Sequence, residues 1–333
     1  MTALDVTPVR PPLKWAGGKR QLLPTLRRLY PDAFDRYVEP FFGSGAVFFD
    51  LFTQGRLAGR AARLFDVNPD LIGCYRMLRD HSAHVIAALS RLARDHRTRG
   101  DAFYYEVRDH RFNVLRASDG RVPSSPAAAD DYTPDLAAML IFLNRTGFNG
   151  LFRLNRDGAF NVPVGRYTNP TICDADHLRQ VSAAFGSPNV TLECRRFDEA
   201  LDEAGAGDFV YCDPPYAPLS RTASFAHYSA GGFTAIDQRR LQHAVIDACR
   251  RGASVVVSNS SAPDIVAGYQ TRAAKDAGLR LSFVDARRAI NSRASLRGAV
   301  KEVLVTNVQR LDAIKPRMLK ATRGRSALKS ARR

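Results

Sequence analysis

The chain alternates apolar runs of strand character with amphipathic stretches of helical period, at its start and through its second half. Predicted strands cover residues 36–41, 63–67, 189–194, 209–212, 254–258 and 281–284. Predicted helices separate some of them, at residues 46–52, 198–204 and 236–251. Such alternation predicts an α/β fold in which helices cover both faces of a parallel sheet.

The pattern changes in the middle of the chain, where helical periodicity dominates. Predicted helices cover residues 71–92, 102–115 and 136–143. A Gly-rich polar run follows at 144–167, and a stretch rich in Ser, Pro, Ala and Asp at 118–134 predicts a surface loop. The simplest architecture is one discontinuous α/β domain, residues 8–68 and 174–309, with a helical domain of residues 69–173 inserted after its second strand.

The overall composition is that of an ordinary globular protein, with 45% hydrophobic and 25% charged residues, and it excludes global disorder. No apolar stretch approaches the roughly 20 residues of a membrane span, and Asp5 and Arg10 interrupt the N-terminus where a signal peptide is apolar. We therefore expect a cytoplasmic protein without a membrane partner. The five cysteines are scattered without metal-ligand spacing, so neither a metal site nor a disulfide framework is expected.

The net charge of the chain, +16 at pH 7, indicates a binding partner of opposite charge. An excess of this size suggests a polyanion, and nucleic acid is the first candidate. Residues 310–333 hold nine Lys or Arg against one acid, and no apolar rhythm follows Ile314. They are predicted to form a disordered basic tail that binds phosphates without reading bases, with a solvated solubility tail as the alternative.

A glycine turn follows the first predicted strand, in the run Glu39-Pro40-Phe41-Phe42-Gly43-Ser44-Gly45. Glycines at such a turn let the backbone approach a ligand closely. The full dinucleotide fingerprint fails because Phe48 replaces its third Gly, and the run Ala16-Gly17-Gly18-Lys19-Arg20 lacks the Ser or Thr of a phosphate loop. Asp66 ends the next predicted strand about 20 residues later, which fits an acceptor for ribose hydroxyls. An ordinary tight turn is the alternative.

A second motif, Asp213-Pro214-Pro215-Tyr216, directly follows the apolar strand at 209–212. The carboxyl ends of strands in open α/β sheets face the crevice that binds ligands. Consecutive prolines fix the backbone, so a carboxylate, a carbonyl and an aromatic face are held in one geometry. This set suits an amino group on a flat base, with Asp213 and the Pro214 carbonyl accepting its hydrogens and Tyr216 stacking on the ring. A proline-rich turn with Tyr216 as packing is the alternative.

The third motif, Leu13-Lys14-Trp15-Ala16-Gly17-Gly18-Lys19, contains the only tryptophan of the chain. A Trp flanked by lysines near a pair of glycines can stack on a base-like ligand, and Lys19 can pair with a carboxylate. A core position for Trp15 is the alternative.

The order of these motifs resembles that of amino-group DNA methyltransferases, with the Gly motif first, Asp213-Pro214-Pro215-Tyr216 last and an insertion between them. More narrowly, the chain is similar to DNA adenine methyltransferases of the Dam type. Residues 66–69 belong to the broader resemblance, and the narrower one rests on three further runs, at residues 142–153, 158–167 and 217–220. It covers nearly everything from residue 12 to residue 307. Phe148 stands where Tyr is common in the family, and Thr146 replaces a bulkier residue.

The resemblance implies a Rossmann-like methyltransferase sheet with an inserted helical target-recognition domain, and S-adenosylmethionine as the cofactor. The residues implied at the cofactor are Trp15, Lys19, Phe41, Gly43, Gly45, Asp66, Asp213 and Phe197, the last packing on the cofactor adenine. The implied catalytic residues are Asp213, Pro214 and Tyr216. The residues implied to contact double-stranded DNA are Lys14, Phe148, Asn149, Leu151, Arg153, Pro163 and Tyr167. The usual target of the family is GATC, and we expect a monomer associated with the nucleoid.

The mechanism follows from the chemistry of adenine N6, whose lone pair is delocalised into the ring. Acceptors for its hydrogens favour a more sp3-like nitrogen that attacks the sulfonium methyl in line, without a covalent enzyme intermediate. A carbon-5 cytosine enzyme would need a Cys, normally after Pro, and the sequence has no Pro-Cys pair. A base inside a duplex cannot be reached, so base flipping is implied. Residues 144–167 mix amides and aromatics with four arginines suited to major-groove reading, Arg145, Arg153, Arg156 and Arg166.

Two other classes of function remain open from the sequence. One is a methyltransferase acting on cytosine N4, RNA or a protein glutamine, since all can use an acid or amide before Pro-Pro-Tyr. The other is a DNA-binding regulator that has lost catalysis. The insertion and the 144–167 segment argue for duplex DNA, and intact Asp66 and Asp213 argue against the regulator.

Overall fold

The computed structural model of the chain describes residues 8–15, 17–117, 125–217, 233–287 and 299–308. Its strands are β1 (Arg36–Glu39), β2 (Ala61–Asp66), β3 (Val190–Cys194), β4 (Asp208–Cys212), β5 (Ser254–Ser260), β6 (Arg280–Arg287) and β7 (Ala299–Thr306). Its α-helices are α1 (Leu23–Leu26), α2 (Ala46–Thr53), α3 (Pro69–Asp80), α4 (Ser82–Glu106), α5 (Asn113–Arg116), α6 (Pro134–Thr146), α7 (Ala175–Phe185), α8 (Phe197–Asp202), α9 (Ala235–Arg250), α10 (Pro263–Tyr269) and α11 (Arg272–Asp276).

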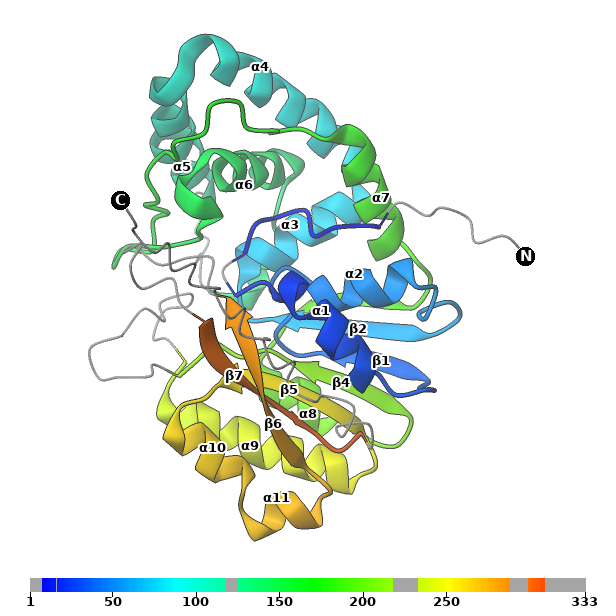
Figure 1. Cartoon of the computed structure of the whole chain (residues 1–333). Coiled ribbons are helices and arrows are strands. Elements are labelled where there is room, and N and C mark those ends of the chain that lie inside the picture. The colour runs from blue at the N-terminus through cyan, green and yellow to red at the C-terminus, as the bar shows by residue number, and fades with distance from the viewer. Residues whose placement is uncertain (1–7, 16, 118–124, 218–232, 288–298, 309–333) are drawn as a thin grey trace, which may run out of the picture.

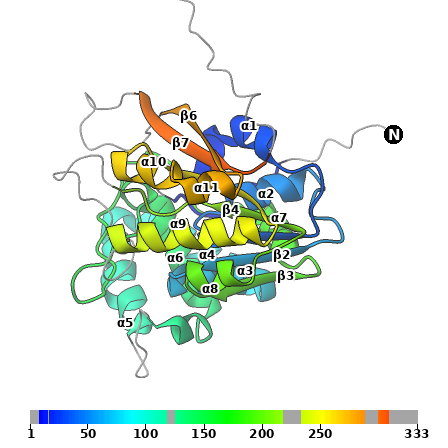
Figure 2. The same ribbon diagram turned by 90° about the horizontal axis from the view of Figure 1, so that it is seen from below.

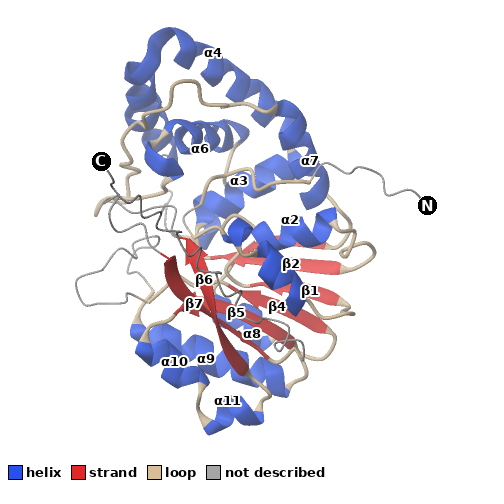
Figure 3. Ribbon diagram, viewed as in Figure 1, coloured by secondary structure: helices blue, strands red, loops and turns tan. Residues whose placement is uncertain are grey.

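The strands form one seven-stranded sheet in the order β3-β2-β1-β4-β5-β7-β6, seen in red in Figure 3. Strands β1 to β5 are parallel, whereas β7 runs antiparallel to both β5 and β6. The expected α/β fold with a Rossmann-like sheet is therefore confirmed. The expectation of a wholly parallel sheet was wrong, because the unpredicted strand β7 turns back between β5 and β6.

Helices cover both faces of this sheet. Figure 1 shows α8, α9 and α10 below the strands and α2, α3 and α7 above them, and Figure 2 shows the lower layer from beneath. Each face has its own apolar core, the lower one built on Val38, Leu241 and Val257 and the upper one on Tyr37, Phe48 and Leu64. All five residues of β4 are buried. Burial on both faces explains why the central strands are near-continuous apolar runs in the sequence.

The helices α3 to α7 all lie between β2 and β3 along the chain, and α4, α5 and α6 rise above the sheet in Figure 1. The predicted helix at 71–92 is divided at His81, which has non-helical backbone angles and separates α3 from α4. Gly100, with φ of 58°, interrupts α4 before the predicted 102–115 helix. That helix continues through a π-helical stretch, Val107–Phe112, into α5. The upper core runs without a break from the sheet into α6.

Some predicted segments lie wholly or partly outside the described residues. These are the basic tail at 310–333, residues 118–124 of the expected surface loop and residues 218–220 of the run after Tyr216. In the described part of that loop, Pro126–Ala129 forms a 3-10 helix. Among the residues that the structure describes, no helix has both the length and the apolar character to cross a membrane.

Candidate active site

The first two motifs meet where the strand order reverses. Strands β1 and β4 are parallel neighbours, with Tyr37 opposite Phe209 and Val38 opposite Val210. The loops after them, residues 40–45 and 213–216, therefore leave the same edge of the sheet. In doubly wound sheets the ligand crevice opens at such a reversal. The structure thus brings together the glycine turn and the Asp213-Pro214-Pro215-Tyr216 run, which lie far apart in the sequence.

The glycine turn is held at both the N–H and the carbonyl of one residue, Gly43. The Gly43 N–H donates to Asp66 Oδ2 at 2.9 Å, and the Gly43 carbonyl accepts from the Tyr75 hydroxyl at 2.8 Å. Gly43 and Gly45 have φ of 49° and 71°, and a Cβ at Gly45 would collide with the Phe42 ring. The turn is therefore rigid and needs its glycines. Sequence reasoning missed the role of Tyr75, which lies in α3 and carries no motif signal.

Asp66 is fixed by backbone donors at the end of β2. Asp66 Oδ1 accepts from the Asn68 N–H at 2.9 Å, while Oδ2 accepts from the Gly43 N–H. Burial raises the pKa of this carboxyl above its usual value, and the backbone N–H donors oppose the rise. Each oxygen keeps a second lone pair, so Asp66 retains the acceptor capacity that a ribose hydroxyl requires.

Asp213 faces a buried cation. Its side chain is 19% exposed, and Lys19 Nζ lies 2.9 Å from its Oδ1. The same ammonium donates to the Gly17 carbonyl at 2.8 Å and lies 4.5 Å from the centre of the Tyr216 ring. Lys19, expected to pair with a carboxylate, pairs with that of Asp213 and also faces the Tyr216 ring.

Burial raises the pKa values of two carboxyls at this edge, Asp213 and Glu39. Burial raises the pKa of Asp213 to about 6, the Glu302 carboxylate adds to the rise, and the Lys19 ammonium opposes it. Glu39, at the end of β1, is 2% exposed and accepts a hydrogen bond from the Tyr37 hydroxyl at 2.8 Å. Its pKa lies well above the usual range, chiefly through burial. Within the described part of the chain, the site is thus acidic around the close ammonium of Lys19.

Aromatic rings line the lower side of the same edge. Phe41 stacks on Phe197 with ring centres 5.2 Å apart and an angle of 21°, and Phe233 meets both rings at their edges. Phe197 begins α8 directly after β3, so the sheet topology brings it beside the β1 loop. Trp15 lies over the glycine turn, where a Cβ on Gly43 would be 3.1 Å from its ring, and it stacks on Phe152 at 5.7 Å. The predicted aromatic residues Trp15, Phe41 and Phe197 therefore lie at or beside the glycine turn.

The predicted nucleic-acid residues lie on an irregular hairpin beyond α6. Bridges join Gly147 to Val164 and Leu154 to Phe160. Exposed side chains gather on it and just after it, those of Phe148, Asn149, Arg153, Pro163 and Tyr167, whereas Leu151 is half-buried. The Arg153 guanidinium donates across the hairpin to Asn161 Oδ1 at 2.7 Å and to the Asn161 carbonyl at 3.1 Å.

A buried amide joins this hairpin to the first motif. Asn144, 2% exposed near the end of α6, accepts from the Lys14 N–H and donates to the Lys14 carbonyl, both at 2.8 Å. It also donates to the Gly150 carbonyl at 2.9 Å. The Lys14 ammonium lies 4.1 Å from the centre of the Tyr167 ring. Lys14 and Trp15 are thereby held against the hairpin. The only signal in the sequence was an Asn directly after the apolar run at residues 136–143.

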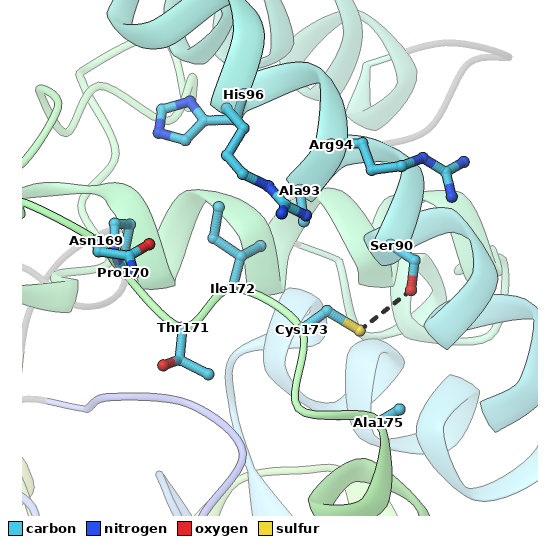
Figure 4. A pocket seen from close by; sticks show the side chains of 11 residues that line it. Ser90, Ala93, Arg94, His96, Asn169, Pro170, Thr171, Ile172, Cys173 and Ala175 are labelled. Carbon is cyan, nitrogen blue, oxygen red and sulfur yellow. Dashed lines mark hydrogen bonds between the residues drawn. The ribbon is translucent and has the colours of Figure 1, made fainter.

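A pocket of about 460 Å³ opens elsewhere, between α4 and the segment before α7 (Figure 4). His96, Ile172 and Cys173 help to line it, and Ser90 Oγ lies 3.3 Å from Cys173 Sγ. None of the described residues that were predicted for the site lines it. The motifs therefore converge on the sheet edge and on the hairpin and leave this pocket aside.

Comparison with known proteins shows which family the chain resembles. The family described as D12 class N6 adenine-specific DNA methyltransferase matches residues 15–283. A type II methyltransferase of Lactococcus lactis subsp. cremoris is 36% identical over 90% of this chain and 95% of its own length. A type II methyltransferase of Methanocaldococcus jannaschii is 35% identical over 90% of this chain and 99% of its own. A DNA adenine methylase of Vibrio cholerae is 34% identical over 88% of this chain and 94% of its own.

Proposed function

We propose the details of a reaction for a chain that belongs to the D12 class of N6 adenine-specific DNA methyltransferases. As a member of that class it is an enzyme that methylates adenine in DNA, and S-adenosylmethionine is its methyl donor. Within this frame we propose that the target adenine lies in duplex GATC and is flipped out of the stack for reaction. We further propose that the chain acts as a monomer at the nucleoid.

The donor set at the sheet edge fits this cofactor. S-adenosylmethionine carries a sulfonium and a net charge of +1, and the edge presents the carboxyls of Asp66, Asp213 and Glu302 around one lysine. In our proposal the turn at 41–45 approaches the cofactor through its backbone, with Gly43 and Gly45 allowing the close approach. Asp66 accepts from the ribose hydroxyls. Phe197 and Trp15 supply aromatic surface to the adenine end and the turn, and Lys19 holds Asp213 ionised.

Catalysis is assigned to three residues after β4. The bound cofactor supplies an electrophilic methyl group. Asp213 accepts one hydrogen of adenine N6 and the Pro214 carbonyl accepts the other, which localises the nitrogen lone pair toward the methyl carbon. Tyr216 stacks on the flipped base and holds it in line. As the N–C bond forms and the C–S bond breaks, the proton released by N6 passes to Asp213.

The pKa of Asp213 sets a pH dependence. Because burial raises that pKa to about 6, the carboxyl is protonated below this pH and can no longer accept from N6. We expect kcat/KM to fall about tenfold per pH unit below about pH 6, since this parameter reports groups of the free enzyme. DNA binding measured over the same range is the control. A kcat/KM that stays flat from pH 5 to 7.5 would contradict this role.

Base reading is assigned to the hairpin and to Lys14. The observation that carries this proposal is the group of exposed aromatic, amide and basic side chains on a hairpin tied to the Trp15 segment by Asn144. Asn149 and Arg153 can bond base edges in the major groove, while Lys14 and Tyr167 flank them. Phe148, 43% exposed, can fill the gap that a flipped base leaves in the stack. Leu151 and Pro163 provide apolar contacts.

Arg153→Ala should relax discrimination within the target by about 1–3 kcal/mol per lost base contact. The measurement is the ratio of kcat/KM for the true site to that for sites with one base pair changed. Asn161→Ala is a matched variant, because it removes the side-chain partner of Arg153 within the hairpin and leaves the guanidinium. Arg179→Ala, at an exposed position of α7, is the control. A ratio unchanged by Arg153→Ala would assign this side chain to phosphate or solvent.

The proposed target and base flipping are tested together with short duplexes. Methyl transfer from labelled cofactor should occur on a GATC duplex and be lost on a duplex with the same composition but no GATC. 2-Aminopurine in place of the target adenine should become brightly fluorescent on binding, because unstacking relieves its quenching. Equal labelling of both duplexes would refute GATC. Fluorescence that stays quenched in the DNA complex of Tyr216→Ala, which lacks the ring proposed to stack on the flipped base, would refute flipping.

A further inference from the structure

A glutamate far along the chain contacts the catalytic tyrosine. The Tyr216 hydroxyl donates to Glu302 Oε2 at 2.7 Å. Glu302 lies in β7, opposite Ser260 of β5 and Val284 of β6, and is 8% exposed. Tyr216 belongs to the loop after β4, so this hydrogen bond spans β5 to reach the next strand of the sheet. It ties the active-site loop to the antiparallel strand that the sequence did not reveal.

The donor and acceptor of this bond have fixed roles. Burial and the neighbouring carboxylates of Asp213 and Glu302 hold the pKa of Tyr216 well above its usual value, so the phenol stays protonated and donates. A hydrogen bond from a hydroxyl to a carboxylate is roughly twice as strong as one between neutral groups. The observed length of 2.7 Å agrees with such a bond.

Together with Lys19, Glu302 holds the Tyr216 ring at two points. The Lys19 ammonium faces the ring at 4.5 Å from its centre, and Glu302 fixes the hydroxyl at the far end. The residue before the tyrosine is fixed as well, because the Pro215 carbonyl accepts from Gln238 Nε2 at 2.9 Å. Gln238 is itself held by Asn259 at 3.0 Å, and both amides are buried. The loop is thus built to keep one geometry.

We propose that Glu302 is a positioning residue for methyl transfer, which sets the plane of the Tyr216 ring so that its face is ready for the flipped adenine. This inference rests on the proposed stacking of Tyr216 on the target base. In this role Glu302 acts through the tyrosine hydroxyl, and its separate effect on the pKa of Asp213 is minimised by assaying well above pH 6. Its loss therefore affects the rate at which bound adenine reacts and leaves the affinity for DNA nearly unchanged.

A double-mutant cycle isolates this role. Glu302→Ala should lower the single-turnover rate about tenfold, because small misplacements at a reacting centre cost one to two orders of magnitude. Glu302→Gln should recover part of the loss, since an amide oxygen still accepts. Tyr216→Phe should lose about as much as Glu302→Ala, and Tyr216→Ala should lose more because the stacking face itself is gone. In the Tyr216→Phe background, Glu302→Ala should cost less than about twofold.

The cycle gives a clear contradiction. Losses that multiply in the double variant would show that Glu302 acts apart from the tyrosine hydroxyl and would overturn the proposal. Glu199→Ala, an exposed acid in α8, controls for loss of negative charge. If Glu302→Ala lowers the melting temperature, Glu302→Gln and Tyr216→Phe test the same hydrogen bond from its acceptor and its donor.

The failure of this proposal is distinguishable from failure of the proposed function. The wild-type protein is first assayed for methylation of GATC and for the 2-aminopurine signal. If both are present and the cycle is additive, only the positioning role is wrong. If wild type methylates adenine in another sequence, the cycle is run on that sequence and still decides the role of Glu302.

Discussion

Asp213→Ala should lower the single-turnover rate of methyl transfer by at least about 100-fold, on the scale of removing a preorganised electrostatic group. The variant loses the acceptor that localises the N6 lone pair and the site that takes the released proton. DNA binding should remain largely intact, because Asp213 contacts no residue of the hairpin proposed to bind DNA. Turnover near the wild-type level would contradict the assignment of catalysis to Asp213-Pro214-Pro215-Tyr216.

The variant also removes the partner of a buried cation, so its folding needs a control. Lys19 is 6% exposed and bonded to Asp213, and truncation leaves its ammonium bonded to the Gly17 carbonyl without the carboxylate. Asp213→Asn keeps an oxygen that can accept from N6 but carries no charge. We expect it to retain more activity than Asp213→Ala, and to lose the acid limb near pH 6. Melting temperatures of both variants separate a lost fold from lost chemistry.

Arg116→Ala should destabilise the protein by about 3–5 kcal/mol, the cost of breaking a buried ion pair from one side. Arg116 and Asp70 are each 4% exposed, and their two hydrogen bonds are both 2.8 Å long. Truncation leaves the Asp70 carboxylate buried without its cation. It also frees the Gly158 carbonyl at the tip of the hairpin, which accepts from Arg116 at 2.8 Å.

The free energy of unfolding in urea measures this effect. Arg179→Ala breaks an exposed ion pair with Asp176 and should change the free energy of unfolding by less than about 1 kcal/mol. Replacing both members, with Asp70→Asn and Arg116→Met together, should cost less than Arg116→Ala alone, because no unpaired charge stays buried. A loss below about 1 kcal/mol for Arg116→Ala would show that the hairpin and α3 do not depend on this pair.

The sequence predicted the part of the fold that depends on local pattern. Strands buried on both faces, such as β4 and β5, contain runs of apolar residues that the hydrophobic pattern of the sequence alone indicates. The glycine turn and Asp213-Pro214-Pro215-Tyr216 were recognisable from residue identity alone. A glycine such as Gly43 indicates backbone freedom, and a proline such as Pro214 indicates a rigid backbone. Their meeting at one edge followed from the expected sheet.

The contacts that hold the site could not be predicted, because they join residues remote in sequence. Glu302 reaches Tyr216 across 86 positions, and Asn144 reaches Lys14 across 130. Neither spacing leaves a periodic signal. The sequence predicted that Lys19 pairs with a carboxylate but did not identify that carboxylate, because Asp213 lies far along the chain. Strand β7 escaped notice for the same reason, since its pairing with β5 and β6 is decided by tertiary structure.

The central claim is that the methyl group goes to adenine N6 within GATC. A plasmid incubated with the protein and S-adenosylmethionine, then read for modified bases at single-nucleotide resolution, reports the base, the atom and the site together. The account predicts N6-methyladenine at the adenine of GATC on both strands, with adenines in other sequences unmodified. N4-methylcytosine, or N6-methyladenine spread over sequences without GATC, would contradict it.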